Sequence, residues 1–547
     1  MMAASRIRTP LLEVRDLTVA LPKGADRAHA VDRVSYTLQT GKITCVVGES
    51  GSGKSMTANA IMGLLPKPHV RVTQGQLMLE GNDLLTRSES EMRRIRGAEV
   101  SMIFQEPMSA LNPLMTVGQQ IAEVLRKTDQ LSGQELRSRI TELLAEMHLP
   151  QPETLQDAYP FRLSGGQRQR VMIAMALALK PRLLIADEPT TALDVTTQKQ
   201  ILALIRNQQE QRGMGVMFIT HDFGVVAEIA DHIVVMEKGR VVEEGSVDQV
   251  LNRPGHPYTR KLIAAVPTLE DHAATQPTDT RFLSVRGATR TFRNGGGMFS
   301  KMRETKALRG VSFDLNEGEI LGLVGESGSG KSTLARSVMG LSSLDAGSIE
   351  IEGKPIGDPT LDLPRTVQFV FQDPYVSLNP RWRISKALTV GPMHHGASRA
   401  EAKARAEEML GFVGLDSGAM ERFPHEFSGG QRQRIGIARA LTMRPRLLIA
   451  DEAVSALDVS VQKEVLGLLE EIRKTMGTAI LFVTHDLRVA ATICHRLVVL
   501  RHGQIVEEGN TRTIFADPND SYTRALLDAV PGRGWHKPQY TIEEEYS

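Results

Sequence analysis

The nine residues VGESGSGKS, from Val47 to Ser55, recur letter for letter from Val324 to Ser332. Both copies fit the pattern G-x-x-x-x-G-K-[ST], in which glycines turn backbone N–H groups toward a phosphate, the lysine adds a positive charge and the serine hydroxyl can hold Mg²⁺. Apolar, β-rich residues precede each copy and helix-compatible residues follow it. Strand, loop and helix N-terminus therefore come in the order that phosphate binding requires. The sequence predicts two phosphate-binding loops rather than two incidental glycine turns.

Composition narrows the class of protein. A chain of 547 residues exceeds what one hydrophobic core usually supports, and 65 Lys and Arg against 64 Asp and Glu give no sign of a nucleic-acid binder. The N-terminus lacks the apolar core of a signal peptide, and the longest apolar uncharged run, residues 171–179, is half the length that spans a bilayer. Cys45 and Cys494 lie in apolar runs, as buried thiols in a reducing compartment do. We expect a cytoplasmic protein that meets membranes only through partners.

The whole chain is duplicated, not only the loops. The segments SGGQRQR, LLIADE and THD each occur twice, 264 positions apart, and the tails HPYTRKLIAAVP and DSYTRALLDAVP repeat at the same offset. Strand-like segments alternate with helical patterns, which indicates parallel α/β cores. We expect one domain at 1–267 and a second at 282–531, each with a C-terminal extension, joined by a polar linker at 268–281 and followed by a tail at 532–547.

Two carboxylates end an apolar strand in each half, in LLIADEP and LLIADEA. Asp187 and Asp451 are placed to reach Mg²⁺, and Glu188 and Glu452 to polarise an attacking water, which are the two tasks of a phosphoryl-transfer site. An acidic helix cap after a strand is the alternative. The nearby phosphate loop disfavours it.

SGGQ, at 164–167 and 428–431, precedes a helical pattern in each half. Two glycines before a helix expose backbone N–H groups, and the helix dipole there favours an anion. Taken alone, such a segment is more often an ordinary turn and cap. Each half therefore has two phosphate-binding elements, the loop and SGGQ, and one half cannot use both on one nucleotide.

The order phosphate loop, FQEP or FQDP, SGGQ, hydrophobic-DE, ALD and THD resembles the nucleotide-binding domains of ABC transporters, twice over nearly the whole chain. The resemblance implies an α/β fold of two tandem P-loop domains, each with a mainly parallel α/β core, an antiparallel β subdomain and a helical subdomain. It implies MgATP hydrolysis, with Gln105 and Gln372 touching Mg²⁺ and the lytic water and with His221 and His485 holding the γ-phosphate. It also implies that the halves pair head to tail as a pseudo-dimer, with each ATP between one phosphate loop and the opposite SGGQ.

The candidate site residues fall into three groups by role. Those expected to act in catalysis are Glu188, Glu452, His221, His485, Gln105 and Gln372. Those expected to bind the nucleotide are Gly48, Glu49, Ser50, Gly51, Ser52, Gly53, Lys54, Ser55, Met56, Ser164, Gly165, Gly166, Gln167, Gly325, Glu326, Ser327, Gly328, Ser329, Gly330, Lys331, Ser332, Thr333, Ser428, Gly429, Gly430, Gln431 and His29. Those expected to hold Mg²⁺ are Ser55, Gln105, Asp187, Ser332, Gln372 and Asp451. Where the family usually stacks adenine on an aromatic ring, His29 can stack, whereas Lys306 in the second half cannot.

The repeated tails resemble those of the peptide and nickel importers, and the fused arrangement with DEAVSALDVS particularly resembles the Yej type, associated with oligopeptides and microcin C. The resemblance implies a motor subunit that is peripheral on the cytoplasmic side of the bacterial inner membrane and works with two permease subunits and an extracytoplasmic solute-binding protein, without nucleic acid. Dipeptides, glutathione and nickel stay open as substrates. Export stays open as the direction, since the motor motifs do not encode it. Two cysteines are too few for the iron–sulfur cluster of some relatives, so none is expected.

Two other classes fit less well. A translation factor of the ABC type joins its domains through a long charged helix, which the short linker at 268–281 does not resemble. A DNA-repair ATPase of this superfamily has zinc cysteines or a long coiled coil, and the sequence shows neither.

The segments at 106–121 and 373–388 combine turn residues with apolar side chains and are expected to dock permease helices, with Met108 and Tyr375 as contacts. Internal packing is the alternative for these segments.

Overall fold

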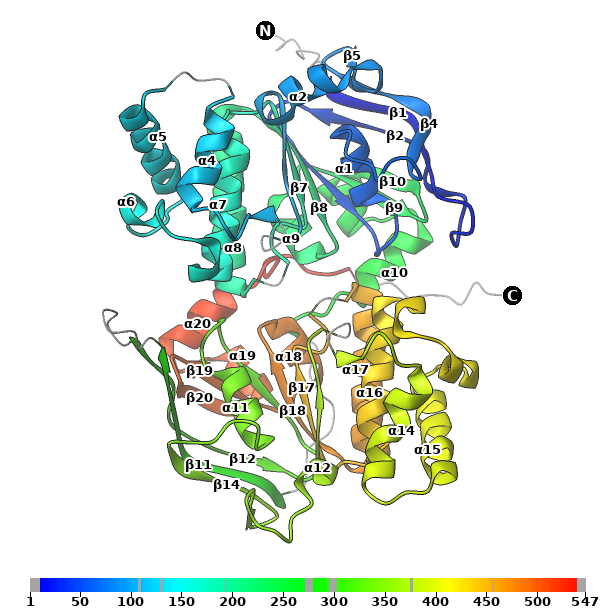
Figure 1. Ribbon diagram of the computed structural model, residues 1–547, viewed down its shortest axis with the longest axis vertical. Helices are drawn as coiled ribbons and strands as arrows, with labels where there is room; N and C mark the ends of the chain where they lie inside the picture. Colours follow the sequence, from blue (N-terminus) through cyan, green and yellow to red (C-terminus); the bar gives the residue numbers. More distant parts are fainter. Residues whose placement is uncertain are drawn as a thin grey trace. The chain divides into compact units, whose positions relative to one another are not determined.

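The computed structural model describes residues 10–106, 110–127, 131–191, 193–270, 279–294, 303–373, 377–455 and 457–538. They form two compact units (Figure 1). The first contains the chain up to Leu193, Thr197–Val266 and the chain from Pro531 onward, and the second contains Asp194–Thr196 and Pro267–Val530. Within these described ranges no helix is both long enough and apolar enough to cross a membrane.

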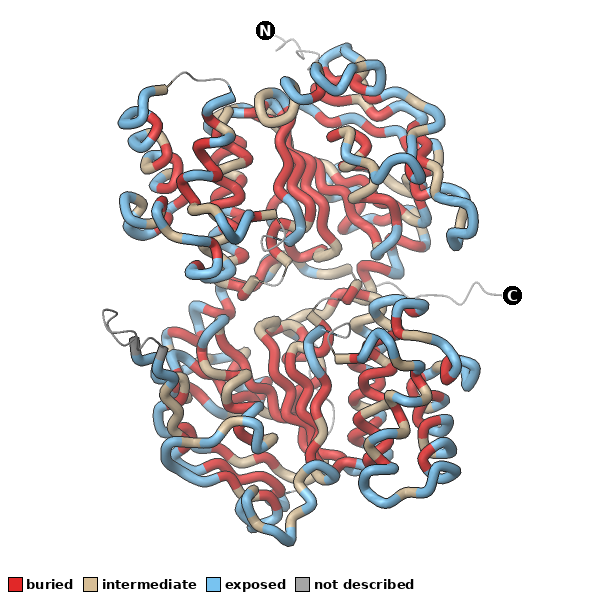
Figure 2. Tube along the Cα trace, viewed as in Figure 1, coloured by how far each residue is buried: buried red, intermediate tan, exposed pale blue. Residues whose placement is uncertain are grey.

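The first unit is built around a six-stranded sheet in the order β10-β9-β3-β8-β7-β6, which is parallel except for β10. Its central strands are buried on both faces (Figure 2), which is why the sequence shows them as continuous apolar runs. The strands are β3 (Ile43–Val47), β6 (Val100–Ile103), β7 (Leu183–Asp187), β8 (Gly215–Thr220), β9 (His232–Glu237) and β10 (Arg240–Ser246).

A second, antiparallel sheet in the order β2-β1-β4-β5 accompanies it. One hydrophobic core joins this sheet, the helix after the phosphate loop and one face of the six-stranded sheet, through Leu12, Val31, Ile61 and Met217 among others. The strands are β1 (Pro10–Ala20), β2 (His29–Gln39), β4 (Arg71–Leu79) and β5 (Asn82–Asp83).

The helices of the first unit begin where local sequence caps them. Ser132 and Ser164 each form a capping box with the residue three positions on. Helices α4, α5 and α6 make a helical subdomain that packs on α7 (Figure 1). The helices are α1 (Lys54–Ile61), α2 (Glu89–Ala98), α4 (Val117–Leu125), α5 (Gly133–Glu146), α6 (Pro152–Leu155), α7 (Gly165–Leu177), α8 (Val195–Arg212), α9 (Phe223–Ile229) and α10 (Pro257–Ala265).

The second unit repeats the plan, with a six-stranded sheet β16-β17-β18-β13-β19-β20 and an antiparallel sheet β12-β11-β14-β15. Its strands are β11 (Arg281–Asn294), β12 (Arg303–Asn316), β13 (Ile320–Val324), β14 (Ala346–Ile351), β15 (Lys354–Pro355), β16 (Val367–Val370), β17 (Leu447–Asp451), β18 (Ala479–Thr484), β19 (Arg496–Arg501) and β20 (Gln504–Asn510). Its helices are α11 (Lys331–Val338), α12 (Leu363–Thr366), α14 (Ile384–His394), α15 (Arg399–Phe412), α16 (Gly429–Leu441), α17 (Val459–Met476), α18 (Leu487–Ile493), α19 (Thr511–Ala516) and α20 (Ser521–Asp528).

The predicted fold class is confirmed, since each unit has a mainly parallel α/β core, an antiparallel sheet and a helical part. The buried positions predicted for Cys45 and Cys494 are also observed. Met108 and Tyr375, the expected permease contacts, lie outside the described residues, as does most of the linker, 271–278.

The described end of the chain, 531–538, packs within the first unit. The indole Nε1 of Trp535 donates to Asn252 Oδ1 at 3.2 Å, and Lys537 Nζ donates to the carbonyl of Val266 at 2.8 Å, just beyond α10. A lysine is favourable there because the C-terminal carbonyls of a helix attract positive charge.

Candidate functional site

Each phosphate loop follows the central strand of its six-stranded sheet and needs its glycines for steric reasons. Gly48 has φ 148° and Gly325 has φ 146°. A Cβ at these positions would lie 2.1 Å from the carbonyl oxygen of Met236 and 2.2 Å from that of Leu500. Only glycine fits there, so this turn has the same shape in both halves.

The lysine of each loop is buried inside it. Lys54 Nζ donates to the carbonyl oxygens of Gly48 at 2.7 Å and Glu49 at 2.8 Å. Lys331 repeats these contacts, at 2.6 and 2.8 Å. The N-cap residues of α1 and α11 are Gly53 and Gly330, which have no side chain to cap the first turn, as suits a turn whose backbone N–H groups bind an anion beside the lysine.

A serine and an aspartate meet at the edge of each loop. Ser55 Oγ donates to Asp187 Oδ1 at 3.0 Å, and Ser332 Oγ donates to Asp451 Oδ1 at 3.3 Å. The pairs come from the first turn of the helix after the loop and from the end of β7 or β17. A hydroxyl and a carboxylate are the hard oxygen ligands that Mg²⁺ prefers, so these residues fit the ion.

The glutamate after each aspartate collects polar partners from three elements. Glu188 Oε2 accepts from Gln105 Nε2 at 2.9 Å and from Thr191 Oγ1 at 3.0 Å, and Glu188 Oε1 lies 3.3 Å from His221 Nδ1. The structure thus brings together the three residues that the sequence assigned separately to catalysis.

The second half assembles the same group, with one difference. Glu452 accepts from Gln372 Nε2 at 2.6 Å and lies 3.2 Å from His485 Nδ1. Ser455, which matches Thr191, donates to the backbone oxygen of Glu452 rather than to its carboxylate. Both glutamates have positive φ, 46° and 49°, which is strained backbone for this residue type and is often found at functional sites.

The two adjacent carboxylates of each half differ in acidity. Burial raises the pKa of Asp187 to about 6, against the effect of its hydrogen bond from Ser55. Burial opposes the ionisation of Glu188 as well, but the hydrogen bond and charge of His221 lower its pKa to about 2. For the same reasons the pKa of Asp451 is raised and that of Glu452 is lowered. The glutamate is therefore the carboxylate of the pair that stays ionised, as a residue that polarises water must.

SGGQ forms a capped helix start in each half. Ser164 Oγ accepts from the N–H of Gln167 at 3.2 Å, and Ser428 Oγ accepts from that of Gln431 at 3.3 Å. The second glycine is required by packing, because a Cβ at Gly166 would lie 2.7 Å from the Thr197 side chain of α8. At Gly430 it would lie 2.4 Å from Val461 Cγ1 of α17.

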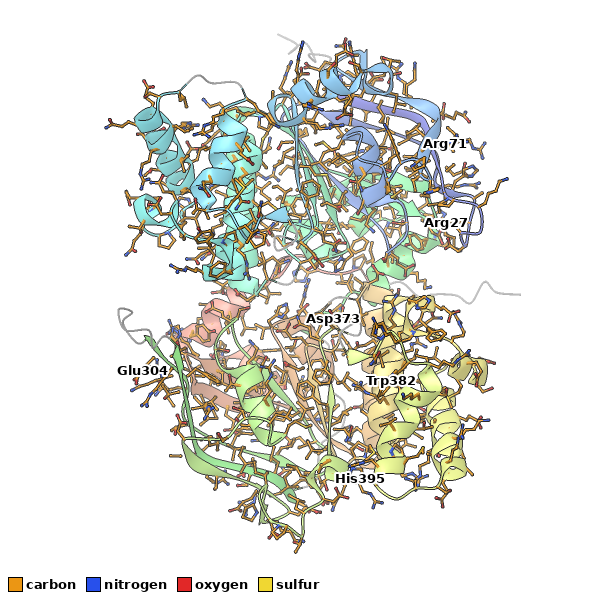
Figure 3. All side chains as sticks on the ribbon, viewed as in Figure 1. Arg27, Arg71, Glu304, Asp373, Trp382 and His395 are labelled. Carbon is orange, nitrogen blue, oxygen red and sulfur yellow. The ribbon has the colours of Figure 1, made fainter. Side chains whose placement is uncertain are left out.

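The surroundings of the two loops differ in charge. In the first half His29 is exposed and, with Arg27, Asp32 and Lys238, lines an open pocket of about 660 Å³. Arg27, on the hairpin between β1 and β2 (Figure 3), donates to the carbonyl oxygen of Gly51 in the phosphate loop. In the second half Glu304 occupies the position of Arg27 and pairs with Arg293 at 3.0 Å.

Sequence reasoning missed one pair of residues at these loops. The hydroxyl of Tyr258 lies 3.1 Å from the backbone nitrogen of Glu49, and that of Tyr522 lies 3.1 Å from the nitrogen of Glu326. The recurrence of YTR in both tails was the available signal. Burial raises the pKa of Tyr522 to about 12, so its hydroxyl stays protonated.

Comparison with known proteins agrees with this geometry. The chain matches the family model described as ABC transporter at residues 31–191 and 308–455, and the model described as oligopeptide/dipeptide transporter, C-terminal region, at 242–290 and 506–545. It is 46% identical over 532 residues to the peptidoglycan transport ATP-binding protein YejF of Agrobacterium fabrum, which covers 95% of this chain and 96% of that protein. It is 45% identical over 557 residues to the glutathione import ATP-binding protein GsiA of Salmonella choleraesuis, and this match covers 95% of this chain and 89% of that protein. Among solved structures, the dimeric ATP-binding cassette MJ0796 bound to ADP and Pi gives a TM-score of 0.40 at 30% identity, over 43% of this chain and 98% of that one.

Proposed function

The chain belongs to the ABC transporter family, with two ATP-binding domains of that family on one polypeptide, and we propose that it drives the import of peptides or peptide-like compounds by hydrolysing ATP at two sites. The observation that carries this proposal is the group around Glu188, repeated around Glu452. In each half one ionised glutamate, one glutamine and one histidine converge at the end of the strand beside the phosphate loop.

The residues of each half divide the chemistry between them. Lys54 and the N–H groups of its loop bind the triphosphate, and Ser55 and Asp187 would hold Mg²⁺, which neutralises charge that develops on the phosphate oxygens. Glu188 accepts a hydrogen bond from the attacking water and orients it. His221 stabilises the ionised form of Glu188.

Substitutions separate binding from turnover and so test these roles. In Glu188→Gln and Glu452→Gln we expect ATP hydrolysis to fall by about a hundredfold or more, because the carboxylate acts mainly in the transition state. The dissociation constant for MgATP should stay near that of the wild type. Lys54→Ala and Lys331→Ala should instead weaken binding itself. Equilibrium binding and phosphate release measure both effects, and a loss of ATP affinity in the glutamine variants as large as in the alanine variants would contradict the assignment.

We further propose that the domains run over 1–267 and 282–531, joined at 268–281, with a tail at 532–547. The partners in this proposal are two permeases and an extracytoplasmic solute-binding protein, with the chain peripheral on the cytoplasmic face of the membrane. A cavity of about 360 Å³ in the second unit supports a docking role for the segment after Gln372. Leu378, Trp382, Leu388 and Val390 line it, beside His395 (Figure 3).

Glutathione import is the second candidate function. The relative named for glutathione import is 45% identical to this chain and the relative named for peptidoglycan transport is 46% identical, so the two names are supported almost equally. Both substrates contain peptide bonds. The tail model described as oligopeptide/dipeptide transporter favours the same chemical class.

A further inference from the structure

In each half the phosphate loop is tied to the C-terminal extension through a single peptide group. The N–H of Glu49 donates to the Tyr258 hydroxyl at 3.1 Å, and the carbonyl of Gly48, which belongs to the same peptide group, accepts from Lys54 Nζ at 2.7 Å. In the second half the N–H of Glu326 donates to the Tyr522 hydroxyl at 3.1 Å, and the carbonyl of Gly325, in the same peptide group, accepts from Lys331 Nζ at 2.6 Å. One peptide group of the loop therefore connects the tyrosine to the phosphate-binding lysine, and this connection occurs in both halves.

The extension holds the first tyrosine firmly. Tyr258 is in the first turn of α10 and is 8% exposed. The carboxylate of Glu243 in β10 accepts from the N–H groups of Gly255 at 2.6 Å and His256 at 3.2 Å, and His256 caps the helix by accepting from the Tyr258 N–H at 3.2 Å. The position of the hydroxyl is thereby set by the sheet and by the helix start.

The second extension reaches the same result with different residues. Glu507 of β20 accepts from the N–H groups of Asn519 at 2.8 Å and Asp520 at 3.3 Å. Asp520 then caps α20 by accepting from the Tyr522 N–H at 2.7 Å. The caps differ between the halves, whereas the glutamate and the tyrosine are the same.

The hydrogen bond matters because of where it acts in the loop. Glu49 follows Gly48, whose backbone is already confined by the carbonyl oxygen of Met236. Fixing the next N–H outward, on the tyrosine, leaves the later N–H groups of the loop to point inward on a phosphate. Without the hydroxyl, the Glu49 N–H loses this partner and the Gly48–Glu49 peptide group is freer to rotate, together with the Gly48 carbonyl that accepts from Lys54.

We propose that Tyr258 and Tyr522 are positioning residues of the phosphate loops, through which the C-terminal extension of each half sets the nucleotide affinity of that same half. The proposal rests on the proposed function, since it takes the loops as nucleotide sites. A partner that shifts α10 or α20 would change the affinity for nucleotide without touching it.

The test measures MgADP binding to the full chain by calorimetry, with one loop disabled at a time. In the Lys331→Ala background, Tyr258→Phe should weaken the remaining site by about fivefold, the effect of one lost hydrogen bond. Tyr522→Phe should leave that site unchanged. In the Lys54→Ala background the effects should be reversed. Steady-state hydrolysis by otherwise wild-type Tyr258→Phe should show a raised KM for MgATP with little change in kcat.

Tyr36→Phe is the matched control, because Tyr36 is a buried phenol of the same unit whose hydroxyl contacts only Met217 Sδ, at 3.7 Å, among the described hydrogen bonds. Equal weakening by Tyr36→Phe and Tyr258→Phe, or a lowered melting temperature of Tyr258→Phe with unchanged affinity, would overturn the inference. If Lys54→Ala together with Lys331→Ala still bound MgADP normally, the proposed function itself would fail. Should Tyr258→Phe not fold, Tyr522→Phe in the Lys54→Ala background decides the question alone.

Discussion

Arg27 and Glu304 occupy matching positions, 277 residues apart, and carry opposite charges. Arg27 contacts the phosphate loop of its own half, whereas Glu304 pairs with Arg293. A positive charge on the first loop, replaced in the second half by a carboxylate that is paired with Arg293, should make the first site bind a nucleotide more tightly. If adenine lies at the position that the family resemblance implies, the difference grows, since the His29 ring can stack on a base and the Lys306 side chain cannot.

Charge reversal at Arg27 tests this inequality. In the Lys331→Ala background we expect Arg27→Glu to weaken MgADP binding by about thirtyfold, because the reversal changes the charge by two units and each unit close to the phosphates at the protein surface is worth about 1 kcal/mol. Lys23→Glu makes the same change in an exposed residue of the same hairpin and serves as the control. Equal weakening by both variants would mean that only the overall charge of the hairpin matters.

At the scale of elements, the sequence predicted what is encoded locally. Ser132 and Ser398 cap α5 and α15 together with a glutamate three residues on, a pattern that is visible in the sequence itself. The contact of Tyr258 with Glu49 spans 209 residues, and the packing of Gly166 against α8 depends on how two helices meet. No periodicity or motif spacing reports such contacts, so they could be read only from the fold.

The cavity beside α14, a groove lined by Leu378, Trp382, Leu388 and Val390, can be tested as a docking site for a permease helix. Trp382 lines it just before the helix begins, with Lys386 Nζ 4.2 Å from its ring centroid. If a permease helix docks there, Trp382→Glu should reduce co-purification of the permeases from membranes by about tenfold, since buried aromatic anchors dominate many interfaces. The melting temperature and MgADP affinity of the isolated chain should not change. Leu341→Glu, an exposed apolar position of the same unit outside the groove, is the control. A fall in melting temperature would identify Trp382 as a core residue instead.

At the scale of the molecule, head-to-tail pairing of the duplicated halves would give a role to both phosphate-binding elements, the loop and the SGGQ helix start. A bound triphosphate needs donors on two sides, and each loop supplies one side. The helix N-terminus at Ser428 would supply the other side for the first loop if the halves pair head to tail, as the resemblance to ABC transporter domains implies. Closure should then depend on ATP, because hydrolysis removes the γ-phosphate that bridges the two elements.

Cysteine cross-linking tests this pairing in a chain whose Cys45 and Cys494 have been replaced by Ala. Ser50 is exposed in the first loop, and a Cβ at Gly429 or at Gly165 would have at least about 4 Å of clearance, so each accepts a cysteine more readily than the crowded Gly430. A disulfide requires Cα atoms within roughly 7 Å, and a short bifunctional linker relaxes this limit.

We expect Ser50→Cys to cross-link to Gly429→Cys within a single chain. The reaction should be more efficient with ATP when Glu188 and Glu452 are Gln, because the unhydrolysed γ-phosphate keeps the site closed. Ser50→Cys should not cross-link to Gly165→Cys of its own half. Efficient reaction of that second pair, or reaction only between separate chains, would exclude composite sites formed within one polypeptide.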